Sequence, residues 1–294
     1  MWNSIKVQLK TMRVSREFRV AMIVTWIYAV VAFVLRTLEV RGIDIFRVED
    51  ANQYVCFSPY HPLFNIFKLI YPFIIVMPFA TSYIDDYKNQ LIMVYASRVS
   101  RVKYFISKLI VAYIGTALIV AIPFLLNLAL CNIFFPHNMN VLYGSYQMKN
   151  YYNTLLGLNF MYEPTSNNLP FLELYLQNPI SYNLLYIALF SLLTGLLGMF
   201  AMACAFVIKK SKILVYVPIY VIVQVAQSVD MAFFNAALDE GEKYIAINPI
   251  DYFLPLNNGG GFSIAIILTE ICLISIGIFL MSIYAINDDI RSLQ

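Results

Sequence analysis

The chain has 294 residues, of which 61% are hydrophobic and only 13% are charged. Soluble domains carry about 45–50% apolar and about 25% charged residues, so these few charges could not cover the surface of a soluble protein of this length. Disorder is excluded too, because a weakly charged chain with 16% aromatic residues collapses. The composition therefore predicts a membrane protein whose main solvent is the bilayer.

Six apolar runs predict an all-α membrane protein, with residues 1–294 forming a single transmembrane permease domain. A membrane-spanning helix needs about 20 predominantly apolar residues. The runs that meet or approach this length are residues 20–35, 69–84, 109–135, 184–208, 213–227 and 262–286. The second run is short, so we expect residues 64–68 to extend it. Pro72 and Pro78 within it permit kinks, because proline removes a backbone donor.

The basic residues predict which side of the membrane each end of these helices faces. Lysine and arginine are enriched in cytoplasmic loops. Fourteen of the twenty fall before the first run, between the second and third, between the fourth and fifth, or after the sixth. This bias predicts six crossings with both termini in the cytoplasm.

Residues 1–19 predict an amphipathic elbow helix at the membrane surface. Its apolar stripe consists of Trp2, Ile5, Leu9 and Met12, and its charged stripe of Lys6, Lys10, Arg13 and Glu17. This pattern is typical of an interfacial helix whose apolar side enters the acyl boundary while its basic side faces anionic headgroups. An ordinary basic segment beside a membrane helix has a similar composition, so that alternative stays open.

Two outer connections are unusual. Residues 136–183 form the longest loop, rich in Tyr, Asn and Leu, and long loops are functional or disordered; we expect a small ordered cap. Cys56 and Cys131 both fall near the outer face, where a disulfide between them is one option, although nothing in the sequence sets their separation.

The cytoplasmic segment 85–108 carries the most information about function. It starts with Asp85 and Asp86, continues through an apolar stretch from Leu91 to Tyr95, and becomes basic before the third run. That stretch is too short to span a bilayer. It predicts a short helix lying against the membrane surface or another protein; a plain extension of the third span is the alternative.

These features resemble the type-2 ATP-binding-cassette (ABC) permease superfamily. The likeness is carried by Ser97-Arg98-Val99-Ser100-Arg101, by the following Tyr104 and Lys108, and by Asn248-Pro249-Ile250-Asp251-Tyr252 before the sixth run. The resemblance implies a permease subunit of a bacterial exporter in the cell (plasma) membrane. It also implies a second identical or related permease subunit and a separate cytoplasmic ATPase that holds ATP and Mg. Residues 235–261 resemble the family's re-entrant outer hairpin.

The resemblance further implies that residues 85–95 form the coupling helix on which the ATPase docks. The docking positions are Asp85, Asp86, Tyr87, Leu91 and Tyr95, and Arg98, Ser100 and Arg101 steady the return into the membrane. The chain has no Gly-x-x-x-x-Gly-Lys-Ser/Thr phosphate loop. We therefore expect no catalytic residue and no cofactor on this chain, and ATP hydrolysis on the partner.

Glu270 is the one charge well inside an apolar run. An ionisable group at such a depth costs about 2.5–3.5 kcal/mol on insertion scales, which makes it a functional candidate. It is a candidate for binding a cationic substrate; a hydrogen bond to a neighbouring helix without any role in transport is the alternative.

The same residues bear on whether the chain is a metalloprotein, a carrier, an enzyme or a sensing subunit. Four cysteines without a Cys-x-x-Cys pair and two histidines give no metal site, and no nucleic-acid-binding motif is present. A gradient-driven carrier or channel predicts several intramembrane charges, whereas only Glu270 is well placed. An intramembrane enzyme predicts His-Glu-x-x-His or Gly-x-Ser-x-Gly, and both are absent. A peptide-immunity or sensing subunit with the same fold, using the 136–183 loop for recognition, stays open.

Overall fold

The computed structural model describes residues 2–43, 48, 50–57, 61, 63–92, 100–137, 171, 174, 177–209, 211–240 and 264–291. Most of the predicted outer cap (136–183), residues 241–261 of the predicted hairpin, Tyr95, Arg98 and the motif at 248–252 lie outside the described residues. Within the described part the secondary structure is entirely helical.

Eight α-helices and one 3-10 turn make up this part of the chain. They are α1 (Trp2–Val14), α2 (Arg16–Val40), η2 (Ala51–Gln53), α3 (Phe64–Val76), α4 (Ser82–Lys88), α6 (Arg101–Phe134), α9 (Pro179–Val207), α10 (Lys212–Glu240) and α12 (Ile264–Arg291). Five of them, α2, α6, α9, α10 and α12, are long and apolar enough to cross a membrane. The prediction of an all-α chain is confirmed for the described residues, and its five long apolar helices are compatible with a multi-pass membrane protein.

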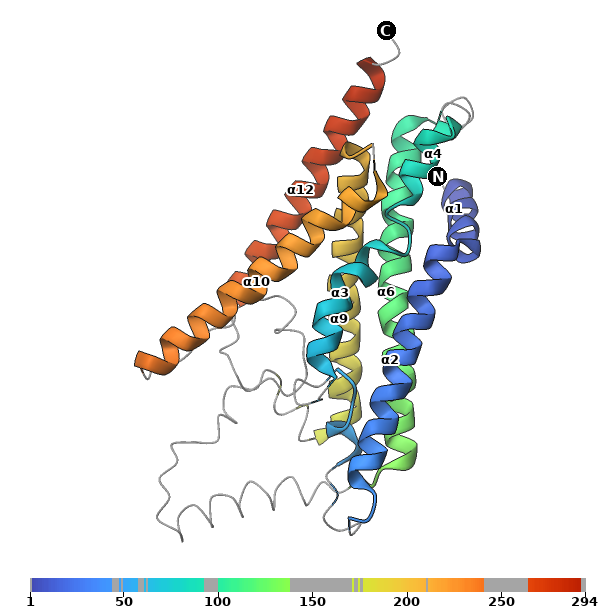
Figure 1. Ribbon diagram of the computed structural model, residues 1–294. Helices are drawn as coiled ribbons and strands as arrows, with labels where there is room; N and C mark the ends of the chain where they lie inside the picture. Colours follow the sequence, from blue (N-terminus) through green and yellow to red (C-terminus); the bar gives the residue numbers. More distant parts are fainter. Residues whose placement is uncertain are drawn as a thin grey trace.

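The helices form a bundle with two outlying members (Figure 1). The antiparallel pair α6 and α9 lies at the centre, with α2 and α3 packed beside it. Helices α10 and α12 lean away from this core, and their apolar windows are largely exposed. Helices α1 and α4 and the last turns of α12 lie at one end of the bundle, called here the α4 end (Figure 1).

Two glycines allow the close approach of α9 to α6. A Cβ atom built on Gly195 would lie 2.9 Å from the Tyr113 ring, and one built on Gly198 would overlap the Thr116 side chain. Small residues at such positions let helix backbones approach closely and maximise van der Waals contact. The close packing of α9 on α6 therefore requires glycine at both positions.

The second apolar run is broken into two helices. Helix α3 begins at Phe64, as the expected extension requires, but it ends at Val76 and residues 77–81 form turns before α4. Pro78 explains the break, because it has no N–H to donate to the carbonyl of Ile74 and its ring collides with that carbonyl in a continuous helix. The 13 residues of α3 rise about 20 Å, less than the ~30 Å hydrocarbon core, so α3 alone is too short to cross.

At the opposite end of the bundle, the segment around η2 is buried although it is not α-helical. The Asn127 side chain of α6 accepts the Cys56 N–H at 2.8 Å and donates to the Ala29 carbonyl of α2 at 2.9 Å. Tyr28 Oη donates to the Cys56 carbonyl at 2.7 Å. Side chains of two long helices thus satisfy backbone groups that water cannot reach. Cys56 and Cys131 are buried free thiols, so the disulfide option is not adopted.

His61 is buried at this end of the bundle as a neutral ring. It is 2% exposed; Nε2 lies 3.2 Å from the Ala32 carbonyl, and Nδ1 accepts the Leu63 N–H at 3.2 Å. Both contacts are satisfied by the tautomer protonated on Nε2. Burial lowers the pKa of His61 below its ordinary value of 6.5.

The lowered pKa of His61 predicts a loss of stability in acid. Below pH 6.5 the unfolded chain binds a proton that the folded chain resists, so the free energy of unfolding falls by at most about 1.4 kcal/mol per pH unit. Above pH 6.5 the ring is neutral in both states and contributes no slope. We expect His61→Gln to reduce this slope in thermal unfolding measured across pH, with His137→Gln at the exposed second histidine measured for comparison.

The packing of α6 on α9 predicts that Gly198→Ala destabilises the protein. The added methyl meets Thr116, and overpacking costs about 1–3 kcal/mol, against about 1 kcal/mol gained from helix propensity. We expect a lower midpoint of thermal unfolding in detergent. Leu192→Ala, at a side chain of α9 that is 52% exposed, serves as the control with a smaller effect. An unchanged or raised midpoint for Gly198→Ala would contradict the packing argument.

Candidate functional site

Helix α4 presents the acidic pair at the α4 end of the bundle. Asp85 lies in its first turn, where a carboxylate is favoured by the helix dipole. The helix stops after Lys88, and Gln90 takes a left-handed conformation with φ +56°. Asp85, Asp86 and Tyr87 therefore belong to a short helix that follows the broken span, and the predicted single helix over 85–95 is interrupted at residues 89–90.

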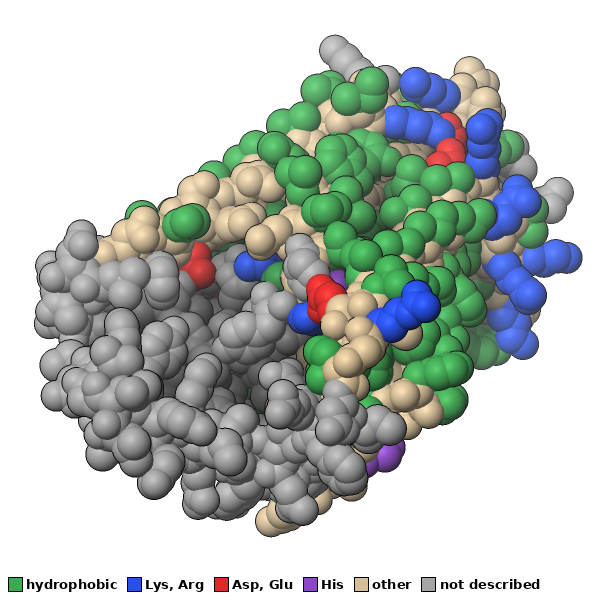
Figure 2. Space-filling view, turned by 60° about the horizontal axis from the view of Figure 1, so that its bottom comes forward, with side chains coloured by type: hydrophobic (Ala, Val, Ile, Leu, Met, Phe, Trp, Pro, Cys, Tyr) green, Lys and Arg blue, Asp and Glu red, His purple; other side chains and the backbone are tan. Residues whose placement is uncertain are grey.

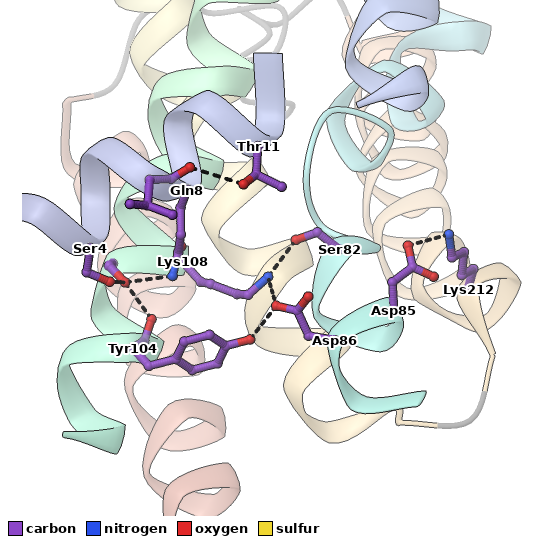
Figure 3. Close-up of polar contacts among 11 residues, drawn as sticks. Ser4, Gln8, Thr11, Ser82, Asp85, Asp86, Tyr104, Lys108 and Lys212 are labelled. Carbon is purple, nitrogen blue, oxygen red and sulfur yellow. Dashed lines mark hydrogen bonds and ion pairs between the residues drawn. The ribbon is translucent and has the colours of Figure 1, made fainter. Parts of the chain in front are cut away.

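The inner member of the acidic pair is bound to a buried lysine of α6. Lys108 Nζ lies 2.8 Å from Asp86 Oδ2 and donates to Ser82 Oγ at 2.9 Å (Figure 3). Tyr104 Oη, one helical turn earlier on α6, donates to the same Asp86 oxygen at 2.6 Å. Lys108 is only 2% exposed, so its charge is compensated by protein groups and not by water.

Two aromatic rings complete the surroundings of this ammonium group. Lys108 Nζ lies 4.8 Å from the centre of the Phe79 ring and 5.6 Å from that of Tyr104. A cation over an aromatic face is attracted by the ring quadrupole, more strongly where water is excluded. Phe79 lies in the turn between α3 and α4, so Lys108 holds both this turn and α4 against α6.

The outer member of the pair is bound to α10. Lys212 Nζ lies 2.6 Å from Asp85 Oδ2 and 3.4 Å from Glu17 Oε1 of α2. The side chains of Lys212 and Asp85 are 36% and 46% exposed, and such exposed pairs contribute little stability individually. Their importance is geometric, because one lysine connects the starts of α10 and α2 to α4.

A third lysine connects α12 to α4. Lys209, in the short connection from α9 to α10, pairs with Asp288 of α12 at 2.7 Å and lies 5.5 Å from the centre of the Tyr87 ring of α4. We call Lys108, Lys209, Lys212 and their contacts on α4 the lysine clasp. The clasp connects α4 to α2, α6, α10 and α12 at one end of the bundle.

Helix α1 supports the clasp from the far side of α6. Ser107, next to Lys108, accepts a hydrogen bond from Gln8 Nε2 at 2.9 Å and lies 2.9 Å from Ser4 Oγ. Ser107 Oγ also donates to the Tyr104 carbonyl at 2.8 Å. The turn of α6 that holds Asp86 is therefore hydrogen-bonded on its other side to α1 (Figure 3).

The remaining predicted site residues lie around the clasp or away from it. Tyr87 and Leu91 are 45% and 38% exposed, which leaves them open to a partner. Ser100 is the N-cap residue of α6 without a side-chain cap hydrogen bond, and Arg101 is the first residue of that helix.

Glu270 lies in α12, far from the clasp, about 27 Å along the helix from Asp288 at 1.5 Å per residue. Its Oε2 atom is buried without a hydrogen-bond partner among the described residues.

The sequence did not assign Lys108, Lys212, Glu17 or Ser82 to one site. One signal was present, because Tyr104 and Lys108 are four residues apart and share a helix face, and Lys108 borders an apolar run where an unpaired ammonium is unfavourable. No local pattern joins Glu17 to Lys212, which lie 195 positions apart.

Comparison with known proteins does not identify a family for this chain. No protein-family model, no curated protein and no solved structure matches the chain. Among the described residues, no group of three or more His, Cys, Asp or Glu side chains is placed to hold a metal ion. The lysine clasp is the densest set of charged contacts between helices in the part of the chain described here.

The buried pair predicts that Lys108→Met destabilises the protein more than the loss of an exposed pair. Breaking a buried pair costs about 3 kcal/mol or more, since the other charge stays unpaired. We expect a clear fall in the thermal unfolding midpoint, partly recovered in the double variant Lys108→Met/Asp86→Asn. Glu39→Gln, which breaks the Arg36–Glu39 pair whose glutamate side chain is 45% exposed, is the control and is expected to cost less, because Arg36 keeps its contact with the Tyr54 ring. Equal effects of the two single variants would refute the special role of Lys108.

Proposed function

We propose that the chain is the membrane-spanning permease subunit of a bacterial ABC exporter, driven by ATP hydrolysis on a separate ATPase chain. The observation that carries this proposal is the lysine clasp. It attaches α4, a short helix with exposed Tyr87, to four long helices at once. A partner that moves α4 would therefore move the starts or ends of these helices.

In the proposed cycle, the two ion pairs of α4 respond differently when a partner displaces α4. Lys108 and Asp86 form a buried, hydrogen-bonded link to α6, which stays closed when α4 is displaced. Lys212 and Asp85 form an exposed link to α10, which exchanges partners readily with water. Displacement of α4 would carry α6 with it and change the position of α10 relative to the α6–α9 pair, as transmission through a packed element requires.

The proposed topology has six crossings with both termini in the cytoplasm. The directions of α2, α6, α9, α10 and α12 support it if the broken segment α3–α4 is counted as the crossing between α2 and α6, which run in the same direction. The basic residues of the α4 end support a cytoplasmic position for the clasp. Two such subunits, identical or related, would form the path in the cell membrane, with Glu270 as its intramembrane polar candidate.

Isolation of the tagged full-length chain from its own cells tests the proposal. We expect a P-loop ATPase to co-purify, and reconstituted complexes to hydrolyse ATP. Because Tyr87, which is part of the clasp, and Leu91, which follows α4, are both exposed, Tyr87→Ala/Leu91→Ala is expected to reduce ATPase recovery at least tenfold, the effect of about 1.4 kcal/mol. Charge reversal at Arg98 and Arg101 is expected to weaken the same association.

Leu38→Ala is the matched control, since Leu38 is 55% exposed at the end of α2 remote from α4; it should leave ATPase recovery unchanged. Transport by the purified chain alone, driven by an ion gradient, would assign the protein to gradient-driven carriers and reject the proposal. Recovery of an ATPase that is insensitive to Tyr87 and Leu91 would reject α4 as the docking site.

A further inference from the structure

A group of polar side chains is buried where η2 meets the ends of α6 and α9. Asp50 and Asn52 are 1% and 2% exposed, and Asn183, near the start of α9, is fully buried. Asn132, in the last turn of α6, is the fourth member. We call these four side chains, one carboxylate and three amides, the amide cluster. Since residues 135–178 connect α6 to α9, the cluster joins both ends of that connection to η2.

Asn52 is the member that contacts the other three. Its backbone N–H and its Nδ2 atom both donate to Asp50 Oδ1, at 2.9 and 2.8 Å. Its Oδ1 atom accepts from the Nδ2 atoms of Asn132 and Asn183, both at 3.4 Å. Its backbone carbonyl accepts from Asn183 Nδ2 at 3.1 Å. The two 3.4 Å contacts are longer than the usual 2.7–3.2 Å of N–H···O hydrogen bonds, so they hold these amides only weakly.

The amide cluster has more oxygen acceptors than donors. Asn132 Oδ1 and Asn183 Oδ1 are buried without a hydrogen-bond partner among the described residues. Asp50 forms no ion pair with a described lysine or arginine, and Arg36 of the neighbouring α2 pairs with Glu39 at 2.6 Å. Figure 2 brings this end of the bundle forward and shows lysine and arginine side chains mainly along one margin of the molecule. Buried charges in proteins are paired or coordinate a metal ion, so this carboxylate calls for a cation.

The oxygens of the cluster are close enough to share one cation. The oxygen and nitrogen of an amide group are about 2.3 Å apart, so Asp50 Oδ1 lies within about 5 Å of Asn52 Oδ1. Rotation of the Asn183 amide about its Cβ–Cγ bond puts its oxygen where its nitrogen lies now, 3.1 and 3.4 Å from two oxygens of Asn52. Two oxygens bound to one Ca²⁺ at 2.3–2.6 Å are at most about 5 Å apart. A small side-chain rotation therefore completes a set of converging oxygens.

We propose that the amide cluster binds Ca²⁺, with Asp50, Asn52 and Asn183 as ligands, Asn132 beside them and water completing the coordination. Oxygen ligands select hard cations. Ca²⁺ accepts six to eight oxygens, amide carbonyls included, in flexible geometry, whereas Mg²⁺ demands a near-ideal octahedron. With one carboxylate the site is weak, in the range of about 10⁻⁴–10⁻³ M that is typical of extracellular calcium modules. The bound ion ties η2 to the start of α9.

Thermal unfolding of the purified full-length chain in detergent tests the proposal. The protein is first treated with a chelator, and CaCl₂ is then added to about tenfold above the expected dissociation constant. A ligand that binds only the folded state stabilises it by mass action. We expect the unfolding midpoint to rise by about 3 °C or more, and MgCl₂ or NaCl at equal ionic strength to produce a much smaller change.

Luminescence of Tb³⁺ reports the bound ion directly. Tb³⁺ prefers oxygen ligands, resembles Ca²⁺ in size and luminesces when a nearby tyrosine is excited. Tyr54 lies two residues after Asn52, and Tyr182 directly precedes Asn183. We expect a tyrosine-sensitised Tb³⁺ signal that Ca²⁺ displaces.

Three variants locate the site. Asp50→Asn removes the charge but keeps an oxygen that can accept the Asn52 N–H groups, and it is expected to abolish the Ca²⁺-dependent rise and the Tb³⁺ signal. Glu39→Gln removes a different carboxylate at this end of the bundle and is the control that keeps both. Asn183→Asp adds a charged ligand and is expected to lower the Ca²⁺ concentration at half of the rise, because affinity depends on ligand charge. This third variant tests the site even if Asp50→Asn does not fold.

A midpoint that does not respond to Ca²⁺, without a Tb³⁺ signal that Ca²⁺ displaces, overturns the proposal and assigns the unpaired amide oxygens to buried water. A rise that Mg²⁺ or Na⁺ reproduces at equal ionic strength also rejects the calcium site. So does a rise that Asp50→Asn retains in full, because the ion then binds elsewhere. None of these measurements involves an ATPase, so their failure leaves the proposed permease function unaffected.

Discussion

The buried ammonium group of Lys108 is the interaction on which the α4 end of the molecule depends. At 2% exposure it cannot be hydrated, so the chain must supply a carboxylate, a hydroxyl and aromatic faces around it. Asp86, Ser82 and Phe79 provide these groups, and all three belong to α4 or the turn before it. The position of α4 is therefore set by the requirement to neutralise one charge on α6.

The bilayer imposes a related constraint at the other end. Backbone groups that leave the helical pattern near a membrane must find partners within the protein. Asn127 and Tyr28 meet this need for the buried segment around Cys56, and His61 does so at the start of α3. The turn after Pro78 satisfies backbone groups locally, with the Ser82 N–H donating to the Phe79 carbonyl, and Lys108 of α6 lies over the Phe79 ring. Irregular backbone thus occurs where side chains of long helices reach it.

The central helix pair and the outlying helices α10 and α12 are packed differently. The α6–α9 pair is tightly packed through Gly195 and Gly198, whereas α10 and α12 bury little of their apolar surface. An exposed ion pair joins α10 to α4, and Lys209 links α12 to α4 by pairing with Asp288 and lying over the Tyr87 ring, while the buried pair joins α6 to α4. A structure built in this way can transmit a displacement of α4 unequally to its core and to its outlying helices, which is what the proposed ATP-driven cycle needs.

Composition and the lengths of the apolar runs predict a helical chain and the approximate extent of its long helices, because about 20 consecutive apolar residues have few stable environments other than a membrane-spanning helix. Its resemblance to ABC permeases also directed attention to Asp85 and Asp86, although it could not reveal their partners. Glu17, Lys108 and Lys212 are distant in the chain, and no periodicity relates them. Which helix each acidic residue contacts follows from the way the long helices pack together. The same packing buries Ile5 and Met12 of α1 and leaves Lys6, Lys10 and Arg13 exposed, since amphipathicity defines two faces but packing selects what covers each one.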